Sequence, residues 1–152
     1  MTFFQIFLIL VAVAAVWDFM TYKIPNALVI GIIGLFFVEN YLSSTGFIYA
    51  PYQTFVLAIL VGFLLYLFRV IGAGDAKLLA ACSLWAADHS LMIFLAATII
   101  SGGIISLAYL RFSKAINTLR PAGANTVEYQ GHLAVPYAIP IFIGCLSMAL
   151  VM

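Results

Sequence analysis

Apolar residues dominate this chain in six segments, which are separated by shorter polar stretches. A helix that crosses a bilayer needs roughly 20 mostly apolar residues. The pattern therefore predicts a single all-α domain over residues 1–152, a polytopic membrane protein with about six transmembrane helices. We expect these helices at residues 3–17, 27–41, 54–70, 76–87, 91–110 and 135–151. The fourth segment is too short for hydropathy alone to assign it a crossing.

One long polar stretch, residues 111–134, separates the fifth and sixth segments. It contains Pro121, Gly123 and Gly131, which disfavour a continuous helix. We therefore expect a loop here, in which residues 111–119 can lie on the membrane surface.

Basic residues predict the orientation of the helices, because cytoplasmic loops are enriched in Lys and Arg. If all six segments cross the membrane, all six basic residues lie on one side; if the fourth does not cross, they split evenly. We therefore expect six crossings, with both termini on the non-cytoplasmic side of the membrane. The basic residues are Lys23, Arg69, Lys77, Arg111, Lys114 and Arg120.

Composition agrees with a chain surrounded by a lipid bilayer. Hydrophobic residues make up 66% of the chain and charged residues 7%, whereas a soluble domain carries about 25% charged residues. The net charge of +1 gives no electrostatic field for binding nucleic acid. No Lys or Arg precedes Lys23, so we expect a retained first helix and not a secretory signal peptide.

The sequence gives no reason to expect a metal or another cofactor. Cys82 and Cys145 lie in apolar runs without the spacing of a zinc site, so we expect two buried small hydrophobic side chains. Neither the HExxH motif of a metalloprotease nor a Walker-type phosphate loop is present.

Two of the five acidic residues are candidates for chemistry. Glu39 and Asp88 are expected in outer loops and Glu128 in the long polar loop, where solvated charges need no further explanation. Asp18 and Asp75 adjoin apolar helices. Ionisable groups at membrane depth are energetically expensive, so each is a candidate functional residue.

Asp18 ends the first helix and is followed by Ile24-Pro25-Asn26. Pro25 restricts Ile24 to an extended conformation and stops the first helix from continuing, and Asn26 can cap the second helix. Taken alone, Asp18 is explained more simply as an interfacial acid near Lys23.

Asp75 lies in the segment Gly72-Ala73-Gly74-Asp75-Ala76-Lys77, where the fourth helix is expected to start. The two glycines allow unusual backbone torsions and the close approach of another chain. An aspartate here can cap the helix, and the helix dipole favours its charged form. Taken alone, a turn followed by a helix cap explains this segment equally well.

Together the two aspartates indicate hydrolysis. Asp18 and Asp75 are expected on the same side of the membrane, so the carboxyl groups can meet if the first and fourth helices pack together. Two adjacent carboxyl groups share one proton. The charged member can then take a proton from water while its neutral partner protonates a substrate carbonyl oxygen, which is general acid–base catalysis.

These residues resemble the two motifs of type IV prepilin peptidases, which are an Asp followed at fixed spacing by Ile-Pro-Asn and the sequence Gly-x-Gly-Asp-x-Lys. The resemblance implies that Asp18 and Asp75 are the catalytic pair of an aspartic endopeptidase. It also implies a prepilin substrate, whose short basic leader is cut off at the cytoplasmic membrane face just before a hydrophobic helix. The broader GxGD class includes archaeal preflagellin peptidases and, more distantly, presenilins.

The chain is similar to the short, peptidase-only members that serve Flp-type tight-adherence pili. Bifunctional members carry an N-terminal cytoplasmic domain with a cysteine tetrad, which is not found here, so we expect no N-methylation. The resemblance implies supporting roles for the motif residues, which are Ile24, Pro25, Asn26, Gly72, Gly74 and Lys77. The identity of the pilin and the oligomeric state stay open.

Three further positions allow more than one interpretation. Lys77 is either a neighbour of the active site or an interfacial base whose charged end reaches water. Pro136 and Pro140 open the last helix and are explained more simply by a helix start and a kink than by contact with substrate.

Other functions fit the sequence less well. A small proton-coupled transporter or channel subunit also uses intramembrane aspartates, but here both acids are expected on one face and not along a path. A serine protease would use Ser101, yet no histidine lies at a pairing distance, and Ser101-Gly102-Gly103 is more typical of helix packing. A non-catalytic scaffold would need neither acid.

Overall fold

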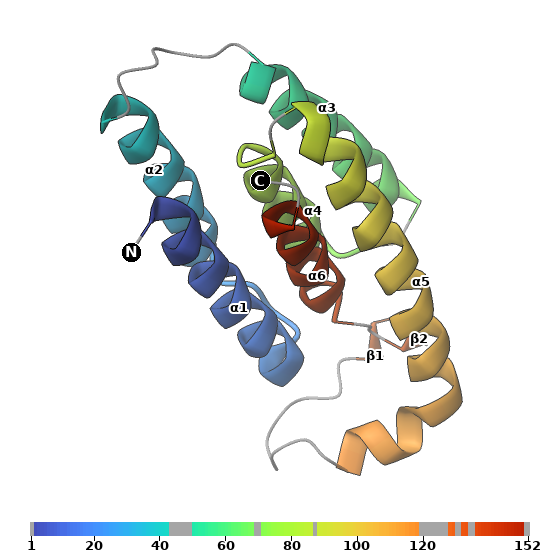
Figure 1. Cartoon of the computed structure of the whole chain (residues 1–152). Coiled ribbons are helices and arrows are strands. Elements are labelled where there is room, and N and C mark those ends of the chain that lie inside the picture. The colour runs from blue at the N-terminus through green and yellow to red at the C-terminus, as the bar shows by residue number, and fades with distance from the viewer. Residues whose placement is uncertain are drawn as a thin grey trace.

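A computed structural model describes residues 2–42, 50–68, 71–86, 88–118, 128–129, 132–133 and 136–150 of the chain. Within these residues the chain forms six helices and one pair of two-residue strands (Figure 1). The helices are α1 (Phe3–Thr21), α2 (Asn26–Leu42), α3 (Ala50–Leu67), α4 (Ala73–Ser83), α5 (Asp88–Thr118) and α6 (Ala138–Ala149), and the strands are β1 (Glu128–Tyr129) and β2 (His132–Leu133).

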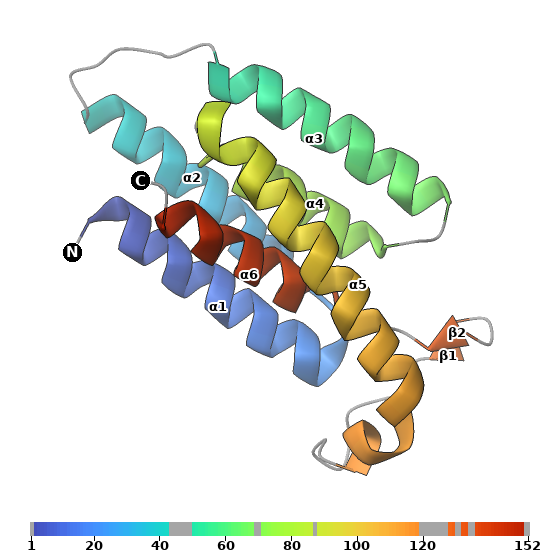
Figure 2. The same ribbon diagram turned by 45° about the vertical axis from the view of Figure 1, so that its right-hand side comes forward.

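Successive helices run in alternate directions, so that α1, α3 and α5 point one way and α2, α4 and α6 the other (Figures 1 and 2). Both ends of the chain lie at the same end of this bundle. Two helices are central: α4 packs against α2, α3 and α6, and α6 packs against α1, α4 and α5. The first turns of α4 and α6 therefore lie at the end of the bundle where α1 finishes.

All six predicted helices are confirmed as helices, although their bounds differ. The fourth helix runs from Ala73 to Ser83 and not over residues 76–87. It starts earlier because Gly72 takes an extended conformation, with φ −73° and ψ 156°, and so becomes its N-cap. Six membrane crossings stay a prediction: among the described residues, only Phe3–Thr21 and Ser90–Ala108 are long and apolar enough to span a bilayer.

The expected loop over residues 111–134 is wrong at its start, because α5 continues to Thr118. Its last turns, drawn in orange, bend away from the bundle (Figure 2). Strands β1 and β2 pair antiparallel, with Glu128 opposite Leu133, which is a small departure from a purely helical fold. The proline and glycines that predicted a loop, Pro121, Gly123 and Gly131, lie outside the described residues.

Two acids expected in outer loops also belong to helices. Glu39 lies in the last turns of α2 and is partly buried, and Asp88 is the first residue of α5. Helical hydrogen bonding thus reaches past the apolar segments into the flanking polar residues.

The far end of α4 is closed by an aromatic cluster around Trp85. Its ring stacks on Phe7 at a centroid distance of 4.6 Å and meets the edge of Phe36 at 5.9 Å. The indole N–H donates a hydrogen bond to the carbonyl oxygen of Ile32, 3.4 Å away. All residues from 78 to 86 are buried, so α4 is shielded by protein, which explains how so short an apolar helix can be accommodated.

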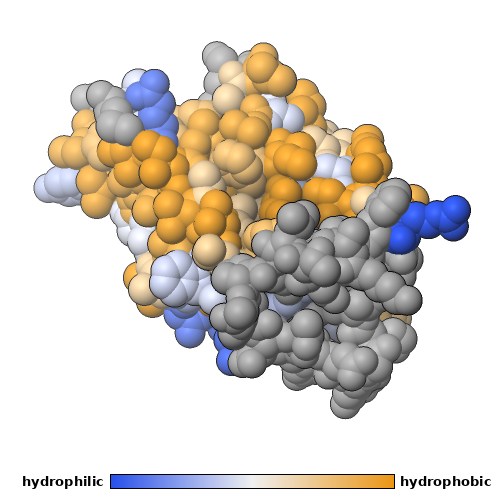
Figure 3. Space-filling model, turned by 90° about the horizontal axis from the view of Figure 1, so that it is seen from below, coloured by the Kyte–Doolittle hydropathy of each residue, from blue (hydrophilic) through white to orange (hydrophobic). Residues whose placement is uncertain are grey.

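The outer helices leave large apolar side chains exposed. Ile30 of α2 is 67% exposed and Ile99 of α5 is 71% exposed, and α3 shows the same pattern along its outer face. Seen from the end where α1 finishes, hydrophobic residues cover most of the coloured surface (Figure 3). Contiguous apolar surface on this scale is what a lipid environment allows and water does not.

Helices α5 and α6 are in close contact at Gly144. A Cβ atom at this position would overlap the Thr98 hydroxyl and would lie 2.9 Å from both the ring and the carbonyl oxygen of Phe94. Only glycine therefore fits where the two helices meet.

We expect Gly144→Ala to destabilise the fold by about 1–3 kcal/mol, the usual effect of overpacking a filled core. Thermal unfolding in detergent can be followed with a thiol-reactive dye, because Cys82 and Cys145 are fully buried in the folded protein. The matched control is Gly103→Ala in α5, where an added Cβ meets nothing within 4 Å. Equal unfolding midpoints for the two variants would contradict this packing.

Candidate active site

Three helix ends meet at one end of the bundle and enclose two carboxyl groups. Asp18 lies near the end of α1 and is 4% exposed, and Asp75 lies in the first turn of α4 and is 9% exposed. The carboxyl groups are close enough for the charge of Asp18 to act on Asp75. The third helix end is the start of α6 at Ala138. The structure thus brings the two aspartates together, while their catalytic role stays a prediction.

Helix α1 ends shortly after Asp18, at a residue in the left-handed backbone conformation. Tyr22 has φ 53° and ψ 28°, and its N–H donates to the carbonyl oxygen of Asp18 at 2.8 Å. The Thr21 hydroxyl donates to the carbonyl of Trp17 at 2.8 Å. Such a conformation is uncommon for a residue other than glycine. It ends α1 three residues before Pro25, the residue expected to break the helix.

Asp18 is held by the backbone of α6. One of its carboxyl oxygens, Oδ2, accepts a buried hydrogen bond of 3.3 Å from the N–H of Ala138. Ala138 is the first residue of α6, so its N–H has no partner within that helix. The positive end of the helix dipole favours a carboxylate at this position. Sequence reasoning missed this contact, although Pro136 and Pro140 marked the helix start.

Asp75 is the third residue of α4, where its Oδ2 accepts a hydrogen bond of 3.2 Å from the N–H of Gly72. This reach back to the N-cap is one half of a capping box. The expectation that Asp75 itself would be the cap was wrong by three positions. Its other oxygen, Oδ1, is buried and has no hydrogen-bond partner among the described residues. A buried polar atom left without a partner is costly, so it is a candidate for a reacting atom.

Glycine brings the two sequence motifs into contact. An ideal Cβ built on Gly74 would lie 3.5 Å from the Cβ of Ile24, so a main chain without a side chain fits against the segment that follows α1. On the opposite side, a Cβ on Gly62 of α3 would lie 3.3 Å from the Cβ of Ala76. The turn that carries Asp75 is therefore packed between α3 and the extended segment before α2.

The remaining motif residues lie at the edge of the site. Pro25 is partly buried, and Asn26 is exposed as the first residue of α2, one position inside the helix that it was expected to cap. Lys77 is exposed and makes no hydrogen bond or ion pair with any described residue. This placement fits an interfacial base better than a neighbour of the carboxyl pair.

The described residues offer no competing centre for chemistry. No group of three or more His, Cys, Asp or Glu residues is found among them. The Ser101 hydroxyl is used in packing, since it donates to the carbonyl of Ala97 at 2.6 Å and of Pro140 at 3.4 Å. Cys82 and Cys145 are free and buried, as expected, and their thiols contact each other between α4 and α6.

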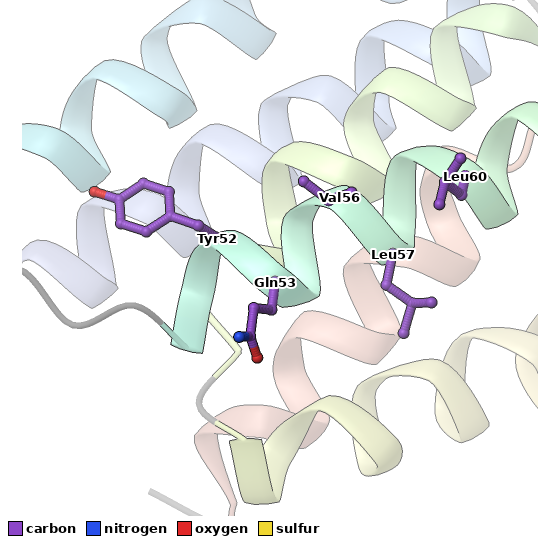
Figure 4. A pocket seen from close by; sticks show the side chains of 5 residues that line it. All are labelled: Tyr52, Gln53, Val56, Leu57 and Leu60. Atoms are coloured by element: carbon purple, nitrogen blue, oxygen red, sulfur yellow. The ribbon is translucent and has the colours of Figure 1, made fainter.

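A shallow hollow of about 470 Å³ lies along α3, apart from the carboxyl groups (Figure 4). It is almost entirely apolar. Its lining residues are Tyr52, Gln53, Val56, Leu57 and Leu60, and none of them belongs to the carboxyl site.

Comparison with known proteins gives one match. A family model described as the type IV leader peptidase family matches residues 5–107, a range that includes Asp18, Asp75 and both sequence motifs. No curated protein and no solved structure matches the chain.

The contact between the two motifs predicts a cross-link. With Cys82 and Cys145 replaced by Ala, the pair Ile24→Cys and Gly74→Cys should form a disulfide on oxidation, because the Cβ separation of 3.5 Å lies in the disulfide range. Non-reducing mass spectrometry of proteolytic fragments would detect it.

The matched control pairs Ile24→Cys with Gly103→Cys, whose position is open and meets no neighbouring atom within 4 Å. Cross-linking of the control pair, or its absence in the test pair, would show that the two motifs do not meet as described.

Proposed function

We propose, since the chain belongs to the type IV leader peptidase family, that this peptidase is an aspartic endopeptidase that removes the basic leader from a prepilin. The observation that supports the aspartic mechanism is the meeting of two buried carboxyl groups, Asp18 and Asp75, at helix ends. Both residues and their motifs lie within the part of the chain that matches the family.

In the proposed reaction the pair shares one proton. The ionised member takes a proton from water, which attacks the scissile carbonyl carbon, while the protonated member gives its proton to the carbonyl oxygen. When the pair protonates the scissile nitrogen, the tetrahedral intermediate collapses, which releases the leader with a new carboxyl terminus and the pilin with a new amino terminus. The pKa values observed for such a site are properties of the pair and not of either residue alone.

Hydrogen bonding suggests which oxygens react. Oδ2 of Asp18 is engaged by Ala138 and Oδ2 of Asp75 by Gly72. Oδ1 of Asp75 has no partner among the described residues, so it is the atom best suited to hold the proton that is passed to the substrate.

We assign the cleavage to the cytoplasmic face of the inner membrane. The family match and the long apolar helices indicate a membrane-associated protein. Support for the side comes from the exposed basic residues. Lys23 follows the end of α1, Lys77 lies near the start of α4 and Arg111 lies in the last turns of α5, which are the ends of these helices on the side of the carboxyl groups. Lys and Arg are enriched on the cytoplasmic side of membrane proteins.

A Flp-type prepilin is the substrate that we propose. Its hydrophobic helix can lie in the bilayer beside the exposed apolar faces of this chain. Its leader then stays in water, on the side where the exposed basic residues of this chain lie. Gly72 is exposed beside Asp75, so an extended segment can approach the carboxyl pair there. The alternative of a proton-coupled transporter or channel subunit is less well supported, since the two buried carboxyl groups of the described residues lie at one end of the bundle.

Replacing either aspartate by asparagine should abolish cleavage, with a loss of at least about 100-fold, because each carboxyl group transfers a proton. The assay mixes the purified protein with a Flp-type prepilin in detergent or liposomes and follows leader removal by mass. Activity should be indifferent to a chelator, since the proposed mechanism routes no step through a metal.

The control variant is Glu39→Gln, which should keep normal activity. It removes a partly buried carboxyl group near the end of α2 that lies away from Asp18 and Asp75. Near-normal activity of Asp18→Asn or Asp75→Asn would show that the pair is not the catalytic centre. If no prepilin is cut while every variant stays folded, a proton-flux assay would test the transporter.

A methyl group at position 72 should slow the reaction, because it would displace a carboxyl group of the proposed catalytic pair. The backbone of Gly72, at φ −73°, is open to any residue, but a Cβ there would lie 3.0 Å from Oδ2 of Asp75. We expect Gly72→Ala to displace this carboxyl group and lower kcat about tenfold, the order of effect of a misplaced catalytic group. Gly34→Ala in α2 is the control, with open space around the added atom. An unchanged kcat for Gly72→Ala would contradict the assigned position of Asp75.

A further inference from the structure

The start of α6 is not capped by its own side chains. Tyr137 precedes the helix as its N-cap and makes no side-chain capping hydrogen bond. Pro140, the third residue of the helix, has no N–H to donate. The first N–H of the helix, on Ala138, is committed to Asp18. The position of this helix end must therefore come from contacts with other helices.

Those contacts come from one face of α5. The Tyr137 hydroxyl lies 3.2 Å from the hydroxyl of Ser106, and the two form a hydrogen bond in which either group can donate. Gly102, one turn earlier in α5, lets the Tyr137 ring approach: a Cβ built there would lie 3.5 Å from the ring and 3.7 Å from Pro140. The Ser101 hydroxyl reaches the carbonyl of Pro140 at 3.4 Å.

These contacts lie next to the hydrogen bond that holds Asp18. Tyr137 and Ala138 are consecutive, so the peptide plane whose N–H points at Asp18 is anchored through the Tyr137 side chain. At 3.3 Å, the bond from Ala138 to Asp18 is already long, and a small further displacement would lose it. Loss of this bond would remove one of the contacts that orient the Asp18 carboxyl group.

We propose that Tyr137 and Ser106 are positioning residues of the peptidase: their shared hydrogen bond fixes the first turn of α6, so that the Ala138 N–H holds Asp18 in the orientation for catalysis. This inference rests on the proposed function. It gives α5, which contributes no group to the reaction, a defined part in it. Neither residue touches the scissile bond, and each acts through the main chain of α6.

The kinetic test compares Ser106→Ala, Tyr137→Phe and the double variant on a prepilin substrate. Each single change removes one end of the same hydrogen bond, so kcat should fall about fivefold with KM unchanged. The double variant should be no slower than the single ones, because one bond is lost in all three. Ser106→Thr keeps a hydroxyl group and should restore most of the rate.

The matched control is Ser147→Ala. It removes a hydroxyl from α6 that bonds only within its own helix, to the carbonyl of Gly144 at 2.6 Å. Its kcat should equal that of the wild type. Additive losses in the double variant, or losses in KM alone, would overturn the proposal.

A second readout does not depend on activity. A hydrophobic carbodiimide modifies carboxyl groups in membrane proteins, and peptide mass spectrometry gives the rate at Asp18 and Asp75 separately. In Ser106→Ala and Tyr137→Phe the rate at Asp18 should rise about threefold as its hydrogen bond is lost, relative to Asp75 in the same sample. The positioning role would be refuted if the ratio of the labelling rate at Asp18 to that at Asp75 were the same in these variants, in the wild type and in Ser147→Ala.

The two readouts separate the failures of the two proposals. If Asp18→Asn still cleaves prepilin, the proposed catalytic pair is wrong, and the labelling ratio alone decides whether Tyr137 and Ser106 orient Asp18. If Asp18→Asn is inactive while the hydroxyl variants match the wild type in both readouts, the positioning role is wrong and the catalytic pair stands.

Discussion

Burying two carboxyl groups beside each other is the constraint on which this structure depends. Desolvation and mutual repulsion both oppose it. The main chain offsets part of the cost, because Gly72 and Ala138 each direct an N–H at one carboxyl group. Both donors belong to helix starts, where amides lack partners within the helix and the dipole favours negative charge. The site thus needs two helices that begin beside the place where α1 ends.

Alternating helix directions meet this need. Helices α4 and α6 run opposite to α1, so both begin at the end of the bundle where α1 finishes. They are also the two central helices, each packed against three others. The outer helices carry the exposed apolar side chains, and glycines at positions 62, 74 and 144 allow the close contacts that hold the centre together.

Much of this arrangement could be predicted from the sequence. Apolar segments gave the six helices, and the motifs identified Asp18 and Asp75 as candidates. The bounds were less accurate, because hydropathy marks where apolar residues stop and not where hydrogen bonding stops. Helix α5 continues past Arg111 through polar residues that tolerate a helix. The Ala138 contact could not be predicted, since it joins residues 120 positions apart through a main-chain atom.

The use of a main-chain donor at Asp18 affects how the site can change over generations. Every amino acid except proline carries an N–H, so a substitution at position 138 can keep the hydrogen-bond donor. Its side chain is fully buried, and therefore both its size and its polarity are restricted. Part of the proposed catalytic site is thus determined by the path of the main chain and not by any side chain.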